Sequence, residues 1–483
     1  MKAGFYESDI TPFYNTRSAT AFDYGLAQGV NTPFSFSAGV FESKDRCVAL
    51  VGADMIILDR ALIDFAEAEL KKLMPLDILL AGASHTHANP VATDWMMMPE
   101  SEVMAMTDIK PEVRERVARE LGRLDPDYKM LLRKRLVDAV WNAWLRRQPV
   151  QLVTGTAKVD NVAFNRRQKM KNGLTATHGG KGNPDIVGNA GPVDTELAAL
   201  GAVNAAGEMI GAVVNFACHG TVSAEKKYSA DWPYYMRETV KRNINPRMSV
   251  VFLNGCCGDV TQIDNLDPAP EPRTERRALV LGERVGFGAV EALRSPEPES
   301  FELISFKQEI LPLNYRTISE ERYQRALADV NEKYDLSKDR WMIGYYARDT
   351  VLLVNRMRKK PLFDCELNAV QIGNLLLLTS PGEVFAQMAL DLKAAAKAEK
   401  FPCVMVSELT NGHAGYIPTP DAFGPGGGGY EPKFGGASFL EIGAFEKIRD
   451  KSIAMLAGFQ PERLAAIPDK IGKPWIAYRP EEL

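Results

Sequence analysis

The sequence is poor in histidine and lacks the cysteine patterns that mark common metal or disulfide scaffolds. Its 483 residues include five histidines and six cysteines. No CxxC spacing is present, which argues against a cysteine zinc site of the usual kind. Free buried thiols are therefore the preferred interpretation of the scattered cysteines, which are Cys47, Cys218, Cys256, Cys257, Cys365 and Cys403.

Long apolar runs and an excess of positive charge are also absent. No stretch approaches the ~18 apolar residues of a membrane-spanning helix, and the opening MKAGFYESDITPF lacks the apolar core of a secretion signal. These absences predict a cytoplasmic protein without a transmembrane segment, although a secreted protein whose leader had been removed would look the same. The formal net charge of −4 does not favour binding to nucleic acid or to an anionic membrane surface.

What is present indicates an α/β fold. Apolar, β-branched runs that end at Gly, Asn, His or Ser clusters predict strands, and amphipathic segments between them predict helices. Because strands and helices alternate, we expect mixed β-sheets flanked by helices. The strand runs lie at 47–57, 76–87, 208–220, 248–259, 369–383 and 403–413, and the helical segments include 60–74, 128–147 and 384–400.

Three segments depart from this alternation. Residues 312–361 are rich in charge at helical spacing, and we interpret them as a helical arm inserted into a single domain that spans residues 1–483. The methionine-rich residues 96–106 suit a lid, a lipid-contacting surface or a subunit interface, with core packing as the default. The glycine-rich residues 424–429 cannot hold regular structure and are typical of a mobile or lid-like loop. Homo-oligomer formation is left open.

Polar residues follow the predicted strands at the points where those strands end. Ligands of open α/β sheets bind beyond the carboxyl ends of the strands, and imidazoles with a carboxylate are suitable ligands for Zn²⁺. Four of the five histidines lie at such ends and only His178 lies elsewhere. Because zinc activates water and polarises carbonyls, the pattern favours a hydrolase. The residues at the strand ends are His85, His87, His219, Asp259, Thr261, Glu383, His413 and Tyr416.

Each candidate ligand also has a purely structural interpretation. His85 and His87 could simply form ordinary hydrogen bonds, and His219 could be a buried imidazole whose two nitrogens are hydrogen-bonded. Glu383 stands at the third helical position of a capping box in SPGE, and Tyr416 suits packing. Their joint placement at strand ends, rather than any one residue, favours a common site.

The motifs taken together resemble the neutral (non-lysosomal) ceramidase family, specifically its N-terminal catalytic domain. Any one motif is weakly specific, but all seven occur in the order in which the family carries them. They are GFYESDITP at 4–12, SHTHANP at 84–90, VAFNRR at 162–167, NFACHGT at 215–221, NGCCGDVT at 254–261, PGEVF at 381–385 and NGHAGYIPTP at 411–420.

The resemblance implies one zinc ion per chain and a set of ligands. In the family a histidine of the SHTH motif, the histidine of HGT, the glutamate of GE and a later tyrosine hold the metal. The matching positions are His85, His219, Glu383 and Tyr416. By this resemblance Glu383 is a metal ligand rather than a helix cap.

The resemblance also implies roles beside the metal. His87 would shuttle a proton or donate a hydrogen bond to the scissile carbonyl. Arg166 would hold a developing oxyanion or a polar headgroup, with a surface charge as the alternative. A further tyrosine that lines the family's site matches either Tyr430 or the position of Phe434, and the YE pair favours Tyr430.

Two carboxylates and one departure from the family complete the predicted site. Asp231 and Asp259 are expected either to orient imidazoles or to cap loops. The family's GDVSPN is replaced by GDVTQI, so a threonine, Thr261, stands in place of a serine discussed as nucleophile or substrate anchor. Its hydroxyl can still form hydrogen bonds, but the extra methyl disfavours direct attack and favours metal-activated water.

We therefore predict a zinc-dependent hydrolase of an amide (N-acyl) bond. The sequence has no recognisable leader and no C-terminal β-sandwich domain, and the GDVS element is altered, so a smaller soluble amide competes with ceramide as the substrate. The alternatives are a catalytically inactive ceramidase-like binding protein and a metal-dependent esterase of a small soluble substrate.

Overall fold

A computed structural model describes residues 1–12, 27–90, 100–121, 126–294, 298–299, 303–333 and 343–461. Residues 96–99 of the methionine-rich segment lie outside these described residues. Within the described part, the rest of that segment forms helix α2 (Glu100–Met104) and the turn after it. Val103 and Met106 are buried there in an apolar cluster, so these two side chains have the core-packing role.

The largest sheet of the described residues is mixed. Its order is β12-β11-β10-β5-β1-β2-β3-β4, with β14 (Pro298–Glu299) beside β5. Two pairs at its ends are parallel, β3 with β4 and β11 with β12, and the other pairs are antiparallel. The strands are β1 (Lys2–Asp9), β2 (Ser35–Glu42), β3 (Cys47–Ala53), β4 (Ile78–Ala83), β5 (Gln148–Lys158), β10 (Glu196–Asn204), β11 (Met209–Phe216) and β12 (Ser249–Asn254).

A second sheet has the order β15-β16-β17-β19. Its strands are β15 (Ile304–Asn314), β16 (Leu362–Ile372), β17 (Leu375–Thr379) and β19 (Cys403–Ser407), and only β17 and β19 run parallel. The run 369–383, which we expected to be one strand, is instead the end of β16, a turn at Gly373–Asn374 and β17. Gly373 has φ +59°, which a glycine adopts without steric cost.

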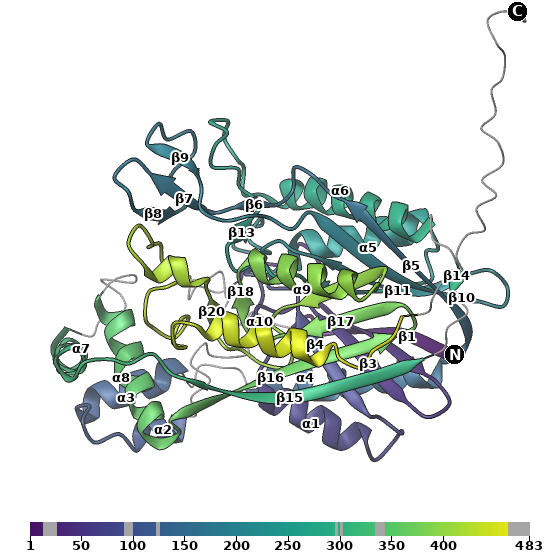
Figure 1. The fold of residues 1–483 in the computed structure, drawn as a ribbon. Coiled ribbons are helices and arrows are strands. Elements are labelled where there is room, and N and C mark those ends of the chain that lie inside the picture. Colours follow the sequence, from purple (N-terminus) through teal and green to yellow (C-terminus); the bar gives the residue numbers. More distant parts are fainter. Residues whose placement is uncertain are drawn as a thin grey trace, which may run out of the picture.

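The two sheets pack face to face between two layers of helices (Figure 1). Alternate residues of a strand point to opposite faces, so Leu377 lies in the core between the sheets and Leu378 in the core under the outer helices. Burial of each such leucine contributes about 1.5–3 kcal/mol. The large sheet is covered by α1 (Arg60–Leu70), α4 (Pro126–Leu145), α5 (Asp231–Asn243) and α6 (Glu275–Arg294), and the second sheet by α9 (Ala386–Ala398) and α10 (Ala444–Met455). The predicted fold class is confirmed.

Residues 315–361 connect two antiparallel strands, β15 and β16, whereas residues 312–314 of the predicted arm belong to β15. The connection contains α7 (Glu320–Lys333) and α8 (Ile343–Lys359). Tyr323 of α7 and Val351 of α8 share an apolar cluster with Val113 of α3 (Pro111–Leu121). The helices therefore pack on a neighbouring part of the chain, and the division into one domain with an inserted arm stays a prediction.

Among the described helices, none combines the length and apolar character needed to cross a membrane.

Candidate metal centre

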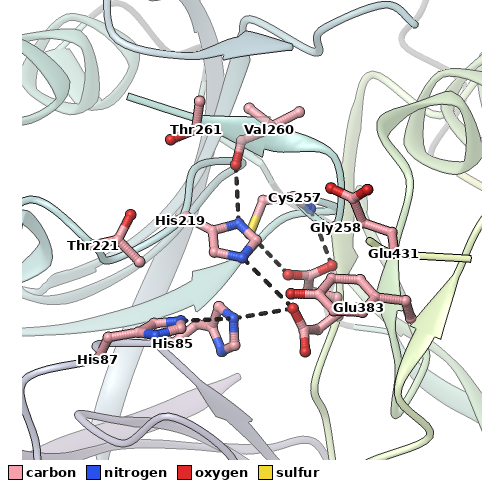
Figure 2. A network of polar contacts seen from close by, with 12 residues as sticks. His85, His87, His219, Thr221, Cys257, Gly258, Val260, Thr261, Glu383 and Glu431 are labelled. Carbon is pink, nitrogen blue, oxygen red and sulfur yellow. Dashed lines mark hydrogen bonds and ion pairs between the residues drawn. The ribbon is translucent and has the colours of Figure 1, made fainter. Parts of the chain in front are cut away.

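Residues from both sheets meet beyond the carboxyl ends of the parallel strand pairs. His85 follows β4, His219 follows β11, Glu383 follows β17 and His413 follows β19. Figure 2 shows His85, His219 and Glu383 pointing toward one another. Parallel neighbours end at the same edge of a sheet, so the fold gathers side chains that are far apart in the sequence.

His85 has an unusual backbone conformation and a fixed ring orientation. Its φ of +62° is rare for a residue with a Cβ and is typical of functional sites. The ring is fully buried, and Nδ1 lies 2.8 Å from the Ile56 carbonyl oxygen. Because a carbonyl can only accept, Nδ1 carries the proton and Nε2 presents a lone pair. That Nε2 lies 3.2 Å from Glu383 Oε2.

His219 repeats this arrangement from the other half of the large sheet. Its Nδ1 donates to the Val260 carbonyl oxygen at 2.9 Å, so its Nε2 also presents a lone pair, 3.5 Å from Glu383 Oε2. Burial, together with the charge of Arg166, lowers the pKa of His219 to about 3. Trp232 Nε1 donates to the His219 carbonyl at 3.1 Å and fixes the loop.

Glu383 lies in the short strand β18 (Glu383–Val384) and is fully buried. Burial alone would raise its pKa, but His85, His219 and His413 hold the pKa well below the usual value. Helix α9 begins only at Ala386, whose N–H donates to Asp259 Oδ1 at 2.8 Å. The helix-cap interpretation of Glu383 is therefore wrong, because the carboxylate of Asp259 caps helix α9 instead.

These three side chains fit a divalent cation. Neither oxygen of Glu383 accepts a hydrogen bond of good geometry from the described residues. The Nε2 atoms of His85 and His219 both lie close to Glu383 Oε2, and a positive charge among these atoms would stabilise the arrangement. Imidazole nitrogen and carboxylate oxygen are ligands that zinc prefers.

His87 lies beside this group. Its Nε2 is 3.3 Å from His85 Nε2, and its Nδ1 is buried without a hydrogen-bond partner among the described residues. Burial and the neighbouring imidazoles lower the pKa of His87 well below its usual value, so the ring is neutral. One nitrogen from each of His85, His87 and His219 lies within 4.8 Å of the others, which adds a three-histidine set to the predicted ligands.

Arg166 is buried rather than a surface charge. Its Nε donates to Glu431 Oε1 at 2.8 Å, Nη1 to His219 Nε2 at 3.0 Å, and Nη2 to the Gly258 carbonyl at 2.7 Å. Burial alone would lower the pKa of Arg166, but Tyr430, Tyr416 and Glu431 hold it above the usual value. A cation at His219 Nε2 requires the Nη1 hydrogen bond to break, and the remaining contacts keep the guanidinium in place.

Tyr416 and Tyr430 form the wall opposite the histidines. Tyr416, in β20 (Tyr416–Ile417), pairs in register with Glu383, and its hydroxyl is 2.7 Å from that of Tyr430. Arg166 Nη2 donates to the Tyr430 hydroxyl at 2.9 Å. Phe434 instead lies beneath the guanidinium of Arg322, which favours Tyr430 for the predicted position.

The glycine-rich loop is tied to a small sheet next to the site. Thr175 of β8 (Thr175–Thr177) donates its N–H to the Gly427 carbonyl, and Arg167 Nη2 donates to the Gly428 carbonyl at 3.0 Å. Gly429 has φ +84°, and a Cβ there would lie 2.5 Å from Thr177 Oγ1. The loop therefore approaches this sheet so closely that a glycine is required, and it presents Tyr430 to Arg166.

The other predicted residues form hydrogen bonds with neighbouring loops. The Thr261 hydroxyl donates to Gln262 Oε1 at 3.1 Å, and Figure 2 shows this residue beside Val260, whose carbonyl oxygen accepts from His219. Asp231 accepts from the N–H groups of Val222 and Ser223. Asp231 thus caps a loop and Asp259 caps helix α9. Neither orients an imidazole, because the backbone carbonyls of Ile56 and Val260 already accept both Nδ1 protons.

Three buried groups were not predicted. Glu431 carries no solvent exposure and pairs with Arg166; its place directly after Tyr430 was the available signal. Glu408 accepts from the N–H groups of Cys257 and Val384, and burial raises its pKa to about 8. Asn411 bonds through its amide to Ala81 N–H and the Leu79 carbonyl, so it extends the edge of β4.

Comparison with known proteins identifies the fold. No family model and no curated protein matches the sequence. A ceramidase complexed with C2 superimposes with a TM-score of 0.70 and 18% identity, covering 96% of this chain and 76% of the ceramidase. The neutral ceramidase from Pseudomonas aeruginosa gives a TM-score of 0.68 with the same identity and coverage. This chain therefore has the fold of the neutral ceramidases, as its motifs predicted.

Proposed function

We propose that this protein is a zinc-dependent hydrolase that cleaves an N-acyl amide bond. One observation carries the proposal. The Nε2 atoms of His85 and His219 lie 3.2 and 3.5 Å from the same oxygen of Glu383, so one divalent cation can be held by all three side chains at once. The shared fold with ceramidases supports amide hydrolysis as the reaction.

His85, His219 and Glu383 would hold the metal, with Tyr416 as the fourth ligand. Zinc, when bound, would supply Lewis-acid polarisation of the scissile carbonyl and would lower the pKa of a water molecule. The hydrogen bonds from both Nδ1 atoms to backbone carbonyls fix the ring orientation, and such outer contacts typically affect metal affinity 10- to 100-fold.

The remaining residues act on the substrate. Neutral His87 has an Nδ1 that no described residue satisfies, so it can accept a proton from the attacking water and return it to the leaving amine. Arg166 and Tyr430 offer fixed donors where negative charge develops on the carbonyl oxygen. Thr261, whose hydroxyl donates to Gln262 Oε1, is assigned a hydrogen-bonding role rather than that of a nucleophile.

Elemental analysis of the purified protein tests the metal. We expect about one zinc per chain, with zinc and amidase activity both lost in His85→Ala and His219→Ala. His178→Ala is the matched control, because that histidine lies outside the cluster, and it should keep the zinc. Full zinc retention in both cluster variants would contradict the proposal.

A substrate panel separates amide hydrolysis from its competitors. Ceramides, shorter N-acyl amides and esters would be assayed with and without a chelator. Chelator-sensitive turnover of amides supports the proposal, whereas turnover of esters alone indicates an esterase. No chelator-sensitive turnover of any compound would indicate a binding protein.

A further inference from the structure

Three cationic side chains lie at residues 430–434, the segment that also carries Tyr430 of the site. We name Arg316, Arg322 and Lys433 the basic rim. Lys433 N–H donates to the Tyr430 carbonyl at 3.0 Å, which closes a turn, so the Cα atoms of these two residues lie within about 7 Å. Tyr430 is 39% exposed and its hydroxyl contacts Arg166, so the turn that carries Lys433 also carries a residue of the site.

Aromatic rings hold the rim together. The Arg316 guanidinium lies 4.6 Å from the Phe423 ring centroid, the Arg322 guanidinium lies 5.3 Å from that of Phe434, and Lys433 Nζ lies 3.5 Å from that of Tyr346. Cation–π contacts of this kind orient a cation without neutralising it. Arg316 also donates to the Ser438 hydroxyl at 2.9 Å, so its position is fixed.

The rim carries no compensating negative charge. None of its three members forms an ion pair with a carboxylate in the described part of the chain. Carboxylates on the same segments are engaged elsewhere, Glu431 with Arg166, Asp349 with Arg348, and Glu441 with Lys447. Burial, together with the charge of Arg322, lowers the pKa of Arg316 to about 10, and its guanidinium donates to the carbonyls of Pro432 and Leu440 rather than to a carboxylate.

Three fixed, mutually repelling cations create a positive potential that an anion would relieve. We infer that the substrate carries an anionic group, a carboxylate or phosphate, that docks on Arg316, Arg322 and Lys433 while its amide lies at the Glu383 site. The inference rests on the proposed amide hydrolysis and narrows its substrate class. A neutral ceramide would leave the rim without a partner, whereas an N-acyl compound with an acidic terminus would engage it.

Three amides with one acyl length test the inference. One is neutral, one has a carboxylate on the amine part, and one has a carboxylate at the far end of the acyl chain. In Arg322→Ala/Lys433→Ala, kcat/KM should fall about 10-fold or more for one of the acidic amides. The loss should appear in KM with kcat unchanged, as for contacts made equally in the ground and transition states. The neutral amide should change less than about twofold.

Two single variants are matched controls. Arg325→Ala removes a cation of the same helix that is paired with Glu321, and Lys447→Ala removes one paired with Glu441. Neither substitution should change kcat/KM for the acidic amides. Added salt should raise the KM of the acidic amide for the wild type and not for the double variant, because rim charges are screened.

Calorimetric binding of the acidic amides to wild type and double variant keeps the test independent of turnover. Equal loss for all three amides, or unchanged binding of both acidic ones, would overturn the inference. The inference would also fall if the double variant bound anionic vesicles more weakly but bound and hydrolysed the acidic amides as the wild type does. That result would make the rim a membrane contact. If the wild type hydrolyses only the neutral amide, the amidase proposal stands and this inference falls. If it binds acidic amides through the rim but hydrolyses none, the amidase proposal falls instead.

Discussion

The two sides of the site are built differently. His85, His219 and Glu383 are at most 1% exposed, and each follows a strand of a packed sheet. Tyr430 and Lys433 stand on a loop, and Tyr430 is 39% exposed. Groups that must meet at one atom are rooted in the sheets, whose packing fixes them, whereas groups that touch the rest of a substrate stand where the chain tolerates change.

Removing the carboxylate from the sheet side should have the largest effect. In Glu383→Ala we expect zinc affinity to fall about 100-fold or more and amidase activity to disappear, because the effect should exceed the 10- to 100-fold typical of outer contacts. Zinc titration followed by activity assay measures both. Glu399→Ala, at an exposed helix end, is the control, and unchanged zinc affinity in Glu383→Ala would leave the three-histidine set as the metal site.

Replacing His87 separates a ligand from a proton carrier. If Glu383 completes the metal site, His87→Asn should keep about one zinc per chain and lose about 10²- to 10⁴-fold in kcat, the usual contribution of a general acid or base. Elemental analysis and steady-state kinetics measure the two effects. Loss of zinc in this variant would place His87 among the ligands and break the assignment made here.

Removing one hydroxyl from the loop side should have a smaller effect. Tyr430→Phe keeps the ring and deletes a group that contacts Arg166 and Tyr416, so we expect kcat to fall about 10- to 100-fold with zinc content unchanged. Tyr315→Phe, in the core under the outer helices, is the control for loss of a tyrosine hydroxyl. A drop in zinc content would show that the loop also supports the metal.

Substitution of Glu408 should change the pH dependence of the free energy of unfolding rather than the activity. Burial raises its pKa to about 8, against about 4.3 when unfolded. Between these values the folded state keeps a proton that the unfolded state has released, so this group makes metal-free protein less stable as pH rises from about 4 to 8. Glu408→Gln should remove that dependence, roughly 3–5 kcal/mol. Urea unfolding of chelated protein at pH 5 and 9 measures it, and an unchanged pH dependence would contradict it.

The sequence predicted the sheet side better than the loop side. His85, His219 and Glu383 could be predicted because each follows an apolar strand and matches a family motif. The hydrogen-bond partners of the two histidine Nδ1 atoms could not be predicted, since they are the backbone carbonyls of Ile56 and Val260, which no side chain marks in the sequence. For that reason the sequence left two roles open for Asp231 and Asp259, orienting an imidazole or capping a loop, and only the folded structure decides between them.

Contacts between segments far apart in the sequence were a second feature that the sequence did not predict. Arg166 and Tyr430 are 264 positions apart and meet only because the glycine-rich loop is tied to β8. The run 369–383 was taken as one strand because apolar residues continue through it, although Gly373 and Asn374 reverse the chain. Periodicity identified the apolar stretch, but the turn depended on one left-handed glycine.

The amide of Asn411 on the edge of β4 has a consequence for biosynthesis. Ala81 and Asn411 are 330 positions apart, so β4 leaves the ribosome long before the side chain that completes its edge. At about 5–20 residues per second, that interval is roughly 20 to 70 s. Between the synthesis of residues 219 and 383 the nascent chain holds His85 and His219 without Glu383, and the site can be completed only when translation has passed residue 416.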